Sequence, residues 1–135
     1  MWTVFDAVDL FCITTNGTRR KNGALVMGAG IARQARDKFP TLDMQFGQAI
    51  STLPYGLLIL PQIKIAAFQV KAHYRQPASL ALIQQSTEML AVWCVEHPTA
   101  QVALNFPGIG LGNLSIAEVL PIIETLPDQV QVWEQ

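Results

Sequence analysis

VMGAGIA, at residues 26–32, and FPGIGLGNL, at residues 106–114, are the two stretches of sequence that decide the fold. Seven of the nine glycines lie within residues 17–30 and 108–112. Glycine lets the backbone turn sharply, so that its N–H groups can approach a ligand closely. Each stretch comes just before or at the start of a segment with a helical pattern, and free N–H groups at helix starts attract anions. The two stretches together predict an anion site built from main chain.

The composition predicts one folded domain over residues 1–135. Half of the 135 residues are apolar and only 14% are charged, which argues against disorder. No apolar run reaches the ~18 residues that a membrane span needs, and the first residues lack the pattern of a signal peptide. We therefore expect a soluble cytoplasmic protein, in which Cys12 and Cys94 are two buried thiols rather than a disulfide.

Charge is distributed unevenly along the chain, although the net charge is only −1. All nine Lys and Arg lie in residues 1–75 beside four acids, whereas residues 76–135 hold six acids and no Lys or Arg. This is not the composition of a generally basic nucleic-acid binder. Near the first glycine stretch lies a local basic region, which is either a nucleic-acid contact or an ordinary solvated surface: Arg19, Arg20, Lys21, Arg33, Arg36 and Lys38.

The hydrophobic pattern predicts strands that alternate with helices. The expected strands are residues 2–6, 10–15, 57–60, 63–68, 101–106 and 130–133. The expected helices are residues 28–39, residues 41–50, a long helix between Pro77 and Pro98, and one that starts at Ser115. This order predicts an α/β domain with a mixed sheet between helical layers. Ligands of such sheets gather outside the carboxyl ends of the strands.

Local signals describe two of the helices further. Ser115 and Glu118 fit a capping box, which sets the start of the last helix, and Pro121 should kink or shorten that helix. In the long helix, spacings of three and four residues predict one buried face, made of Leu80, Ile83, Thr87, Leu90 and Cys94.

Other phosphate and metal motifs do not fit the sequence. The third small residue of a G-x-G-x-x-[GA] dinucleotide motif would fall at Arg33, and the position of the expected ribose-binding acid is apolar around Ile50. No G-x-x-x-x-G-K-[ST] stretch exists, which excludes an NTPase loop. The two His and two Cys lack metal-site spacing, so we expect no metal and no cofactor.

Three motifs, in order along the chain, resemble those of the macrodomain family. The first is Asn16 with residues 27–32, the second is FQVKAHYR at residues 68–75, and the third is residues 106–114 followed by Glu118. They are most similar to the branch that holds the bacterial DNA ADP-ribosyl glycohydrolase antitoxins and the terminal ADP-ribose protein glycohydrolase. The resemblance implies a three-layer α/β/α macrodomain-like fold with a mixed central sheet, and an ADP-ribose site.

The resemblance also implies which residues form that site. Lys71 would be catalytic, by acting at the anomeric carbon of the distal ribose. A lysine forms an imine there only when it is neutral, so burial, helped by nearby Arg75, has to lower its pKa. Asp6 would be an adenine contact, and residues 73–75 are either site wall or surface. The residues implied to bind ADP-ribose are Asn16, Met27, Gly28, Gly30, Ile31, Pro107, Gly108, Ile109, Gly110, Leu111, Gly112 and Asn113.

The sequence departs from the family pattern in its acidic residues. Gly112 stands where the protein-directed enzyme has its second catalytic residue, an Asp, and neither ligand loop carries an acid. The DNA-directed members resemble this chain in having a Gly-rich loop there. We therefore predict an ADP-ribosyl glycohydrolase that acts on a modified macromolecule, DNA rather than protein. The alternatives are a non-catalytic ADP-ribose-binding module, an ADP-ribose 1″-phosphate phosphatase, and an α/β domain with another small ligand.

Overall fold

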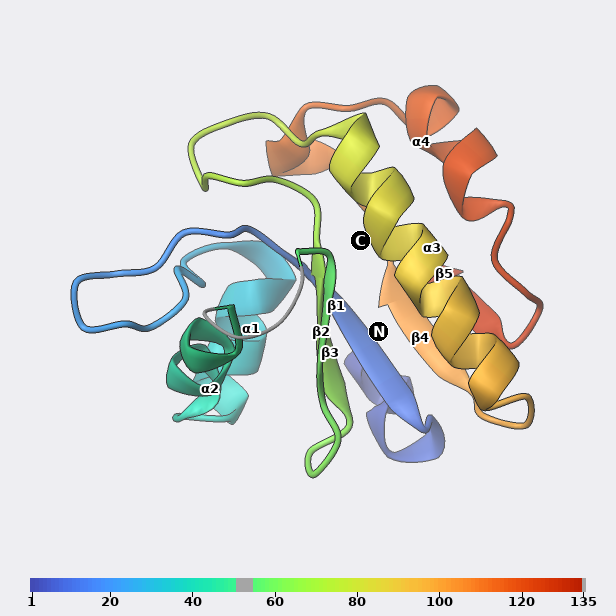
Figure 1. Cartoon of the computed structure of the whole chain (residues 1–135), viewed down its shortest axis with the longest axis horizontal. Helices are drawn as coiled ribbons and strands as arrows, with labels where there is room; N and C mark the ends of the chain where they lie inside the picture. Colours follow the sequence, from blue (N-terminus) through green and yellow to red (C-terminus); the bar gives the residue numbers. More distant parts are fainter. Residues whose placement is uncertain (51–54, 135) are drawn as a thin grey trace.

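The computed structural model describes residues 1–50 and 55–134, and its centre is one five-stranded sheet (Figure 1). In spatial order the strands are β2-β3-β1-β4-β5. Strand β2 runs antiparallel to β3, and every other pair of neighbours is parallel. The mixed sheet confirms the prediction. The strands are β1 (Leu10–Thr15), β2 (Leu57–Leu60), β3 (Ile65–Gln69), β4 (Val102–Asn105) and β5 (Val130–Trp133).

Helices cover both faces of the sheet. Helices α1 (Gly30–Lys38) and α2 (Leu42–Ile50) lie on one side, and α3 (Leu80–Glu96) and α4 (Ile116–Ile123) lie on the other (Figure 1). This is the predicted three-layer α/β fold. No helix of the described residues is long and apolar enough to cross a membrane.

The central strand β1 contributes to two separate hydrophobic cores. Phe11 and Ile13 pack with the side chains of α1 and α2, whereas Leu10 and Cys12 pack with those of α3 and α4. A strand that is buried on both faces reads as a continuous apolar run, which is the pattern of residues 10–13. Cys12 and Cys94 are both buried and free, as expected.

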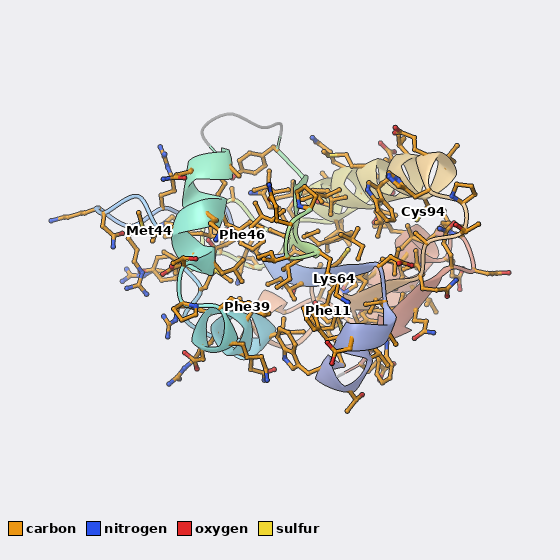
Figure 2. The ribbon with its side chains drawn as sticks, turned by 90° about the horizontal axis from the view of Figure 1, so that it is seen from below. Phe11, Phe39, Met44, Phe46, Lys64 and Cys94 are labelled. Atoms are coloured by element: carbon orange, nitrogen blue, oxygen red, sulfur yellow. The ribbon has the colours of Figure 1, made fainter. Side chains whose placement is uncertain are left out.

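The N-terminal segment differs from its prediction. Residues 2–6 were expected to form a strand, but Trp2–Ala7 is a 3-10 helix, η1. The amino group of Lys64 donates to the carbonyl oxygens of Phe5 and Val8 and lies over the Phe5 ring. Figure 2 shows Lys64 near η1 and Phe11. A distant lysine thus bonds carbonyl groups of this segment, and a short apolar pattern cannot reveal it.

The buried face of α3 differs from its prediction at one end. Ile83, Thr87, Leu90 and Cys94 are buried, and so is Ser86. Leu80 is exposed because it is the first residue of the helix, beyond the edge of the core. In α4 the capping box of Ser115 and Glu118 is present, and Pro121 lies within a helix of only eight residues.

Candidate functional site

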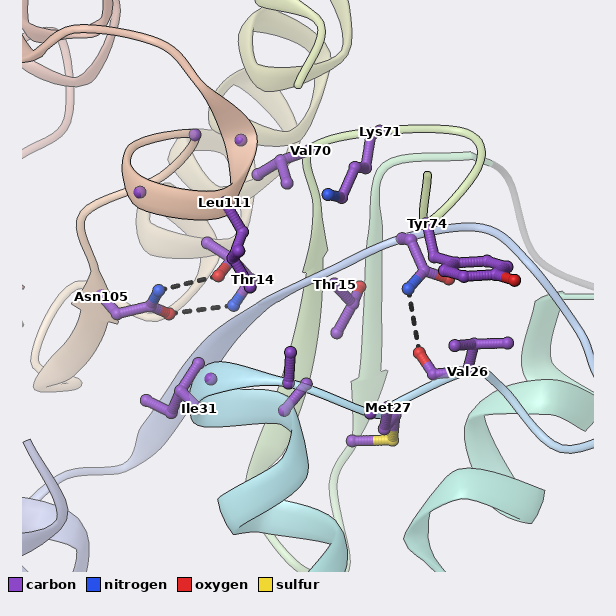
Figure 3. A pocket seen from close by; sticks show the side chains of 18 of the residues that line it. Thr14, Thr15, Val26, Met27, Ile31, Val70, Lys71, Tyr74, Asn105 and Leu111 are labelled. Atoms are coloured by element: carbon purple, nitrogen blue, oxygen red, sulfur yellow. Dashed lines mark hydrogen bonds between the residues drawn. The ribbon is translucent and has the colours of Figure 1, made fainter. Parts of the chain in front are cut away.

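A cavity of about 820 Å³ opens at the carboxyl ends of the four parallel strands (Figure 3). Thr14 and Thr15 end β1, Lys71 follows β3, Asn105 ends β4 and Trp133 ends β5. This is the edge of the sheet at which the sequence placed a ligand. The loop before α1 and the loop around residues 108–113 form further walls of the cavity.

The side chain of Asn105 joins strands β1 and β4 at the floor of the cavity, where their backbones no longer pair. Strands β1 and β4 pair only as far as Cys12 and Leu104. Beyond that point the Asn105 side chain replaces the backbone: its Oδ1 accepts from Thr14 N at 2.9 Å, and its Nδ2 donates to Thr14 Oγ1 at 2.7 Å (Figure 3). Asn105 is only 7% exposed. Its side chain therefore bridges the diverging strand ends while keeping their polar groups satisfied.

The first loop leaves backbone donors unused. Helix α1 starts at Gly30, and its N-cap, Ala29, makes no side-chain cap hydrogen bond. Within the described part of the chain, the N–H groups of residues 28–31 donate to no protein acceptor. All four residues line the cavity. Free N–H groups and the helix dipole make this wall a favourable place for an anion.

The second loop has a similar construction on the opposite wall. It contains the 3-10 turn η2 (Gly110–Gly112), held by hydrogen bonds from Leu114 N to Gly108 O at 3.0 Å and from Ala78 N to Gly112 O at 2.9 Å. Gly108 has a φ of +81°, and a Cβ there would lie 2.8 Å from Ile83, so this position requires glycine. Among the described residues, the N–H groups of residues 108–111 also lack a protein acceptor.

Asn16 lines the cavity and also closes a hairpin at its edge. Its Nδ2 donates to Val26 O at 2.9 Å, and its Oδ1 accepts from Thr18 N at 2.8 Å. We name residues 18–26 the basic hairpin, because Arg19, Arg20 and Lys21 lie at its end and a bridge pairs residues 19 and 25. The sequence did not indicate this structural role of Asn16.

Lys71 lies just after β3, and its amino group points into the cavity (Figure 3). Burial lowers its pKa below the ordinary value of a lysine, because desolvation disfavours the charged ammonium. Arg75 was expected to contribute to this shift, but desolvation is its only resolved cause. The Arg75 guanidinium instead lies 5.3 Å from the centre of the Tyr74 ring.

The charges around the cavity are of one sign. Arg20, Lys71 and Arg75 line it, and no Asp or Glu is among the described lining residues. The described residues also include no group of three His, Cys, Asp or Glu side chains that could hold a metal ion. The cavity therefore suits an anionic ligand and offers no carboxylate as a general base.

Solved structures have the same architecture. No protein-family profile matches the sequence, and no curated protein sequence is significantly similar to it. The macrodomain of Mycobacterium tuberculosis DarG is 26% identical, with a TM-score of 0.73, over 94% of this chain and 88% of that one. The macrodomain of Thermus aquaticus DarG is 25% identical, with a TM-score of 0.70, over the same shares of the two chains. The chain has the macrodomain fold.

A third structure extends the comparison of this macrodomain. Thermosipho africanus DarTG, solved in complex with ADP-ribose, has a TM-score of 0.75 at 20% identity. The match covers 95% of this chain but only 38% of the DarTG chain. At this identity the likeness concerns the fold, whereas the two DarG macrodomains support a place in their branch.

The macrodomain brings nearly all of the sequence-derived candidate residues together. Every one of them lines the cavity except Pro107, which is buried next to Gly108. Asp6 lies in η1, and neither it nor His73 lines the cavity. Sequence reasoning missed several lining residues, for which the only local signal is a polar or aromatic residue at a strand end: Thr14, Thr15, Asn105 and Trp133.

The Asn105 side chain allows a test of how this macrodomain keeps its cavity open. We predict that Asn105→Leu lowers the free energy of unfolding by about 1–3 kcal/mol, because it leaves the partly buried Thr14 N and Oγ1 without these partners. Urea unfolding followed by tryptophan fluorescence measures the change. Gln101→Leu, at the exposed start of the same segment, is the matched control and should change stability by less than about 0.5 kcal/mol. Equal stability of the two variants would contradict the bridging role.

Proposed function

We propose that this macrodomain binds ADP-ribose in the cavity and releases ADP-ribosyl groups from a modified macromolecule. The observation that carries the proposal is the pair of loops at residues 28–31 and 108–111, whose backbone N–H groups have no acceptor among the described residues. Two opposed sets of such donors suit a diphosphate. The complex of Thermosipho africanus DarTG with ADP-ribose, on the same fold, supports this choice of ligand.

The proposed ligand lies across the cavity from one wall to the other. Its diphosphate lies between the two loops, and its distal ribose lies at the end where Lys71 points inward. The amide of Asn16 makes two hydrogen bonds to backbone. It keeps one further donor and one further acceptor site for the ribose. The apolar walls are Met27, Ile31, Ile109 and Leu111.

Lys71 is the proposed reactive residue. The neutral amine bonds to the anomeric carbon of the distal ribose, the bond from that carbon to the macromolecule breaks, and the leaving atom takes a proton from the amine nitrogen. Opening of the ribose ring gives the imine. Water then adds to the same carbon, which releases ADP-ribose and restores the lysine. The lowered pKa of Lys71 supports this role, because it raises the fraction of neutral amine.

Substitution of Lys71 separates binding from chemistry. We predict that Lys71→Ala abolishes release of ADP-ribose from ADP-ribosylated DNA while its Kd for ADP-ribose stays within about fivefold of the wild type. Lys71→Arg is the matched control, because arginine keeps the charge but stays protonated and forms no imine. Calorimetric titration and chromatography of the released product measure the two effects. Full turnover by Lys71→Arg would exclude covalent chemistry at this position.

The pH dependence follows from the direction of the pKa shift. Below the pKa of Lys71 the ammonium carries a proton and cannot attack, so the rate should rise with pH to a plateau. Because burial lowers the pKa, the midpoint should lie below the ~10.4 of free lysine. The imine can also be trapped by reduction with cyanoborohydride at a series of pH values. The amount of trapped protein, measured by mass spectrometry, should rise with the fraction of neutral Lys71. A midpoint at or above that of free lysine would contradict the role of burial.

We infer that the modified macromolecule is DNA rather than protein. The basic hairpin carries Arg19, Arg20 and Lys21, all exposed, and Arg20 lines the cavity. The hairpin is joined to the rim by a hydrogen bond from Tyr74 N to Thr18 Oγ1 at 3.1 Å. Cations that reach beyond the ligand cavity suit a phosphate backbone.

Exposed aromatic rings lie next to these cations. His73 and Tyr74 are both exposed, and their rings stack with centroids 4.8 Å apart. Arg75 lies over the Tyr74 ring, and Tyr74 and Arg75 line the cavity. Aromatic faces beside cations are the usual means of holding nucleobases, which supports a nucleic-acid substrate.

Removal of two hairpin charges tests the DNA assignment. We predict that the double variant Arg19→Ala/Lys21→Ala slows release from ADP-ribosylated DNA about tenfold or more at low salt and flattens its salt dependence. Its affinity for free ADP-ribose should not change, because neither residue lines the cavity. Arg36→Ala/Lys38→Ala loses the same charge at the far end of α1 and should behave as wild type. Faster release from ADP-ribosylated protein than from DNA would contradict the assignment.

A second candidate function is a non-catalytic module that reads ADP-ribose. The absence of Asp and Glu from the described lining residues favours it, because no carboxylate is available to activate water. The two functions share the binding site and differ in turnover. Wild-type protein that binds ADP-ribose but releases none from modified DNA or modified protein would establish this second function.

A further inference from the structure

Three buried polar side-chain atoms in the described part of the chain have no hydrogen-bond partner. They are Thr15 Oγ1, Thr87 Oγ1 and Trp133 Nε1. Thr15 is 3% exposed, ends the central strand β1 and lines the cavity. An unpaired buried hydroxyl destabilises a folded protein, and an apolar side chain of similar shape avoids that cost. The structure of the free protein therefore gives no reason for a threonine at this position.

The polar side chains near Thr15 are already occupied. The Asn105 amide bonds to Thr14, and the Asn16 amide bonds to residues 18 and 26. Gln69, which pairs with Thr15 in the β1–β3 register, accepts a hydrogen bond from Gly56 N. Each of these three side chains therefore already has a hydrogen-bond partner other than the Thr15 hydroxyl.

Thr15 lies at the reactive end of the cavity. Val70 N donates to Thr15 O at 2.9 Å, so the backbones of Thr15 and of the residue before Lys71 are joined directly. Figure 3 shows the Thr15 side chain in the cavity together with Lys71 and Val70. A ligand group that reaches Lys71 therefore also comes next to Thr15.

We propose that the Thr15 hydroxyl hydrogen-bonds a hydroxyl of the terminal ribose of bound ADP-ribose. The inference rests on the proposed function, since it takes ADP-ribose as the ligand. Thr15 Oγ1 is buried in the free protein, so the contact requires rotation about the Cα–Cβ bond. A rotation of about 120° takes the side chain to another staggered rotamer, in which the hydroxyl occupies the former position of the methyl group or of the Cβ hydrogen.

The decisive experiment compares two ligands on one substitution. Thr15→Val removes the hydroxyl and keeps the shape. Calorimetric titration should give an affinity for ADP-ribose about threefold to tenfold weaker than wild type, and an unchanged affinity for ADP, which lacks the terminal ribose. The Tm of the free variant should rise by a few degrees, because the unpaired hydroxyl is gone. Thr15→Ser, which keeps the hydroxyl, should restore the affinity for ADP-ribose.

Thr87 supplies a matched control. Its hydroxyl is also buried and without a partner, but it lies on α3 and does not line the cavity. Thr87→Val should raise the Tm in the same way and leave the affinities for both ligands unchanged. If Thr15→Val does not fold, Thr15→Ala provides the same comparison between ADP-ribose and ADP.

Three outcomes would overturn the inference, and they are distinguishable. If Thr15→Val binds ADP-ribose as tightly as wild type, the hydroxyl makes no contact with the ligand. If it loses the same factor on ADP, the contact is not with the terminal ribose. If the wild type binds neither ligand, the proposed function itself fails and this inference fails with it.

Discussion

The two hydrogen bonds between Asn105 and Thr14 are the interaction on which the site depends. In open α/β sheets, ligands bind in the crevice outside the carboxyl ends of the strands. Here β1 and β4 stop pairing at Cys12 and Leu104, and one amide side chain bridges the polar groups that the divergence exposes. The cavity can therefore extend down to the sheet without unpaired backbone at its floor. The position of the second glycine loop follows from this opening, because that loop begins where β4 has ended.

Several polar groups of the cavity have no hydrogen-bond partner among the described residues of the free protein and can bond a ligand that enters it. Its unpaired groups are the N–H groups of residues 28–31 and 108–111, the Thr15 hydroxyl and the indole N–H of Trp133, all within the described residues. The two buried groups, the Thr15 hydroxyl and the Trp133 indole N–H, lower the stability of the free protein, and all of these groups can donate to a ligand that accepts a hydrogen bond. The same physics acts on Lys71, where burial that is unfavourable for the ammonium favours the reactive amine. Stability and function thus oppose each other around one cavity.

Sequence patterns predicted the parts of this protein that depend on local order. The buried strand of residues 10–15, the capping box at Ser115 and the glycine-rich loops are each determined within a few residues, and the structure contains them. The placement of Lys71 after an apolar strand likewise predicted that it faces the ligand edge of the sheet. The fold class followed from the order of these elements and from the resemblance to macrodomains.

Features that join distant residues were not predictable in this way. The strand expected at residues 2–6 is a 3-10 helix, and Lys64, far along the chain, donates to the carbonyl oxygens of Phe5 and Val8. The bridging role of Asn105 depends on Thr14, and the importance of Thr15 depends on which neighbours are already occupied. A sequence read residue by residue shows a polar side chain at a strand end, but not whether it has a partner.

Gly47 of α2 shows how closely the parts of this chain constrain one another. A Cβ at this position would lie 1.8 Å from the carbonyl oxygen of Gly23, because the basic hairpin rests directly on the helix. The Leu25 N to Asp43 O bond, at 2.8 Å, joins the same two segments. The hairpin and α2 therefore form one module. Residues 18–26 transferred into another macrodomain would keep their conformation only if the helix beneath them also has a glycine at the point of contact.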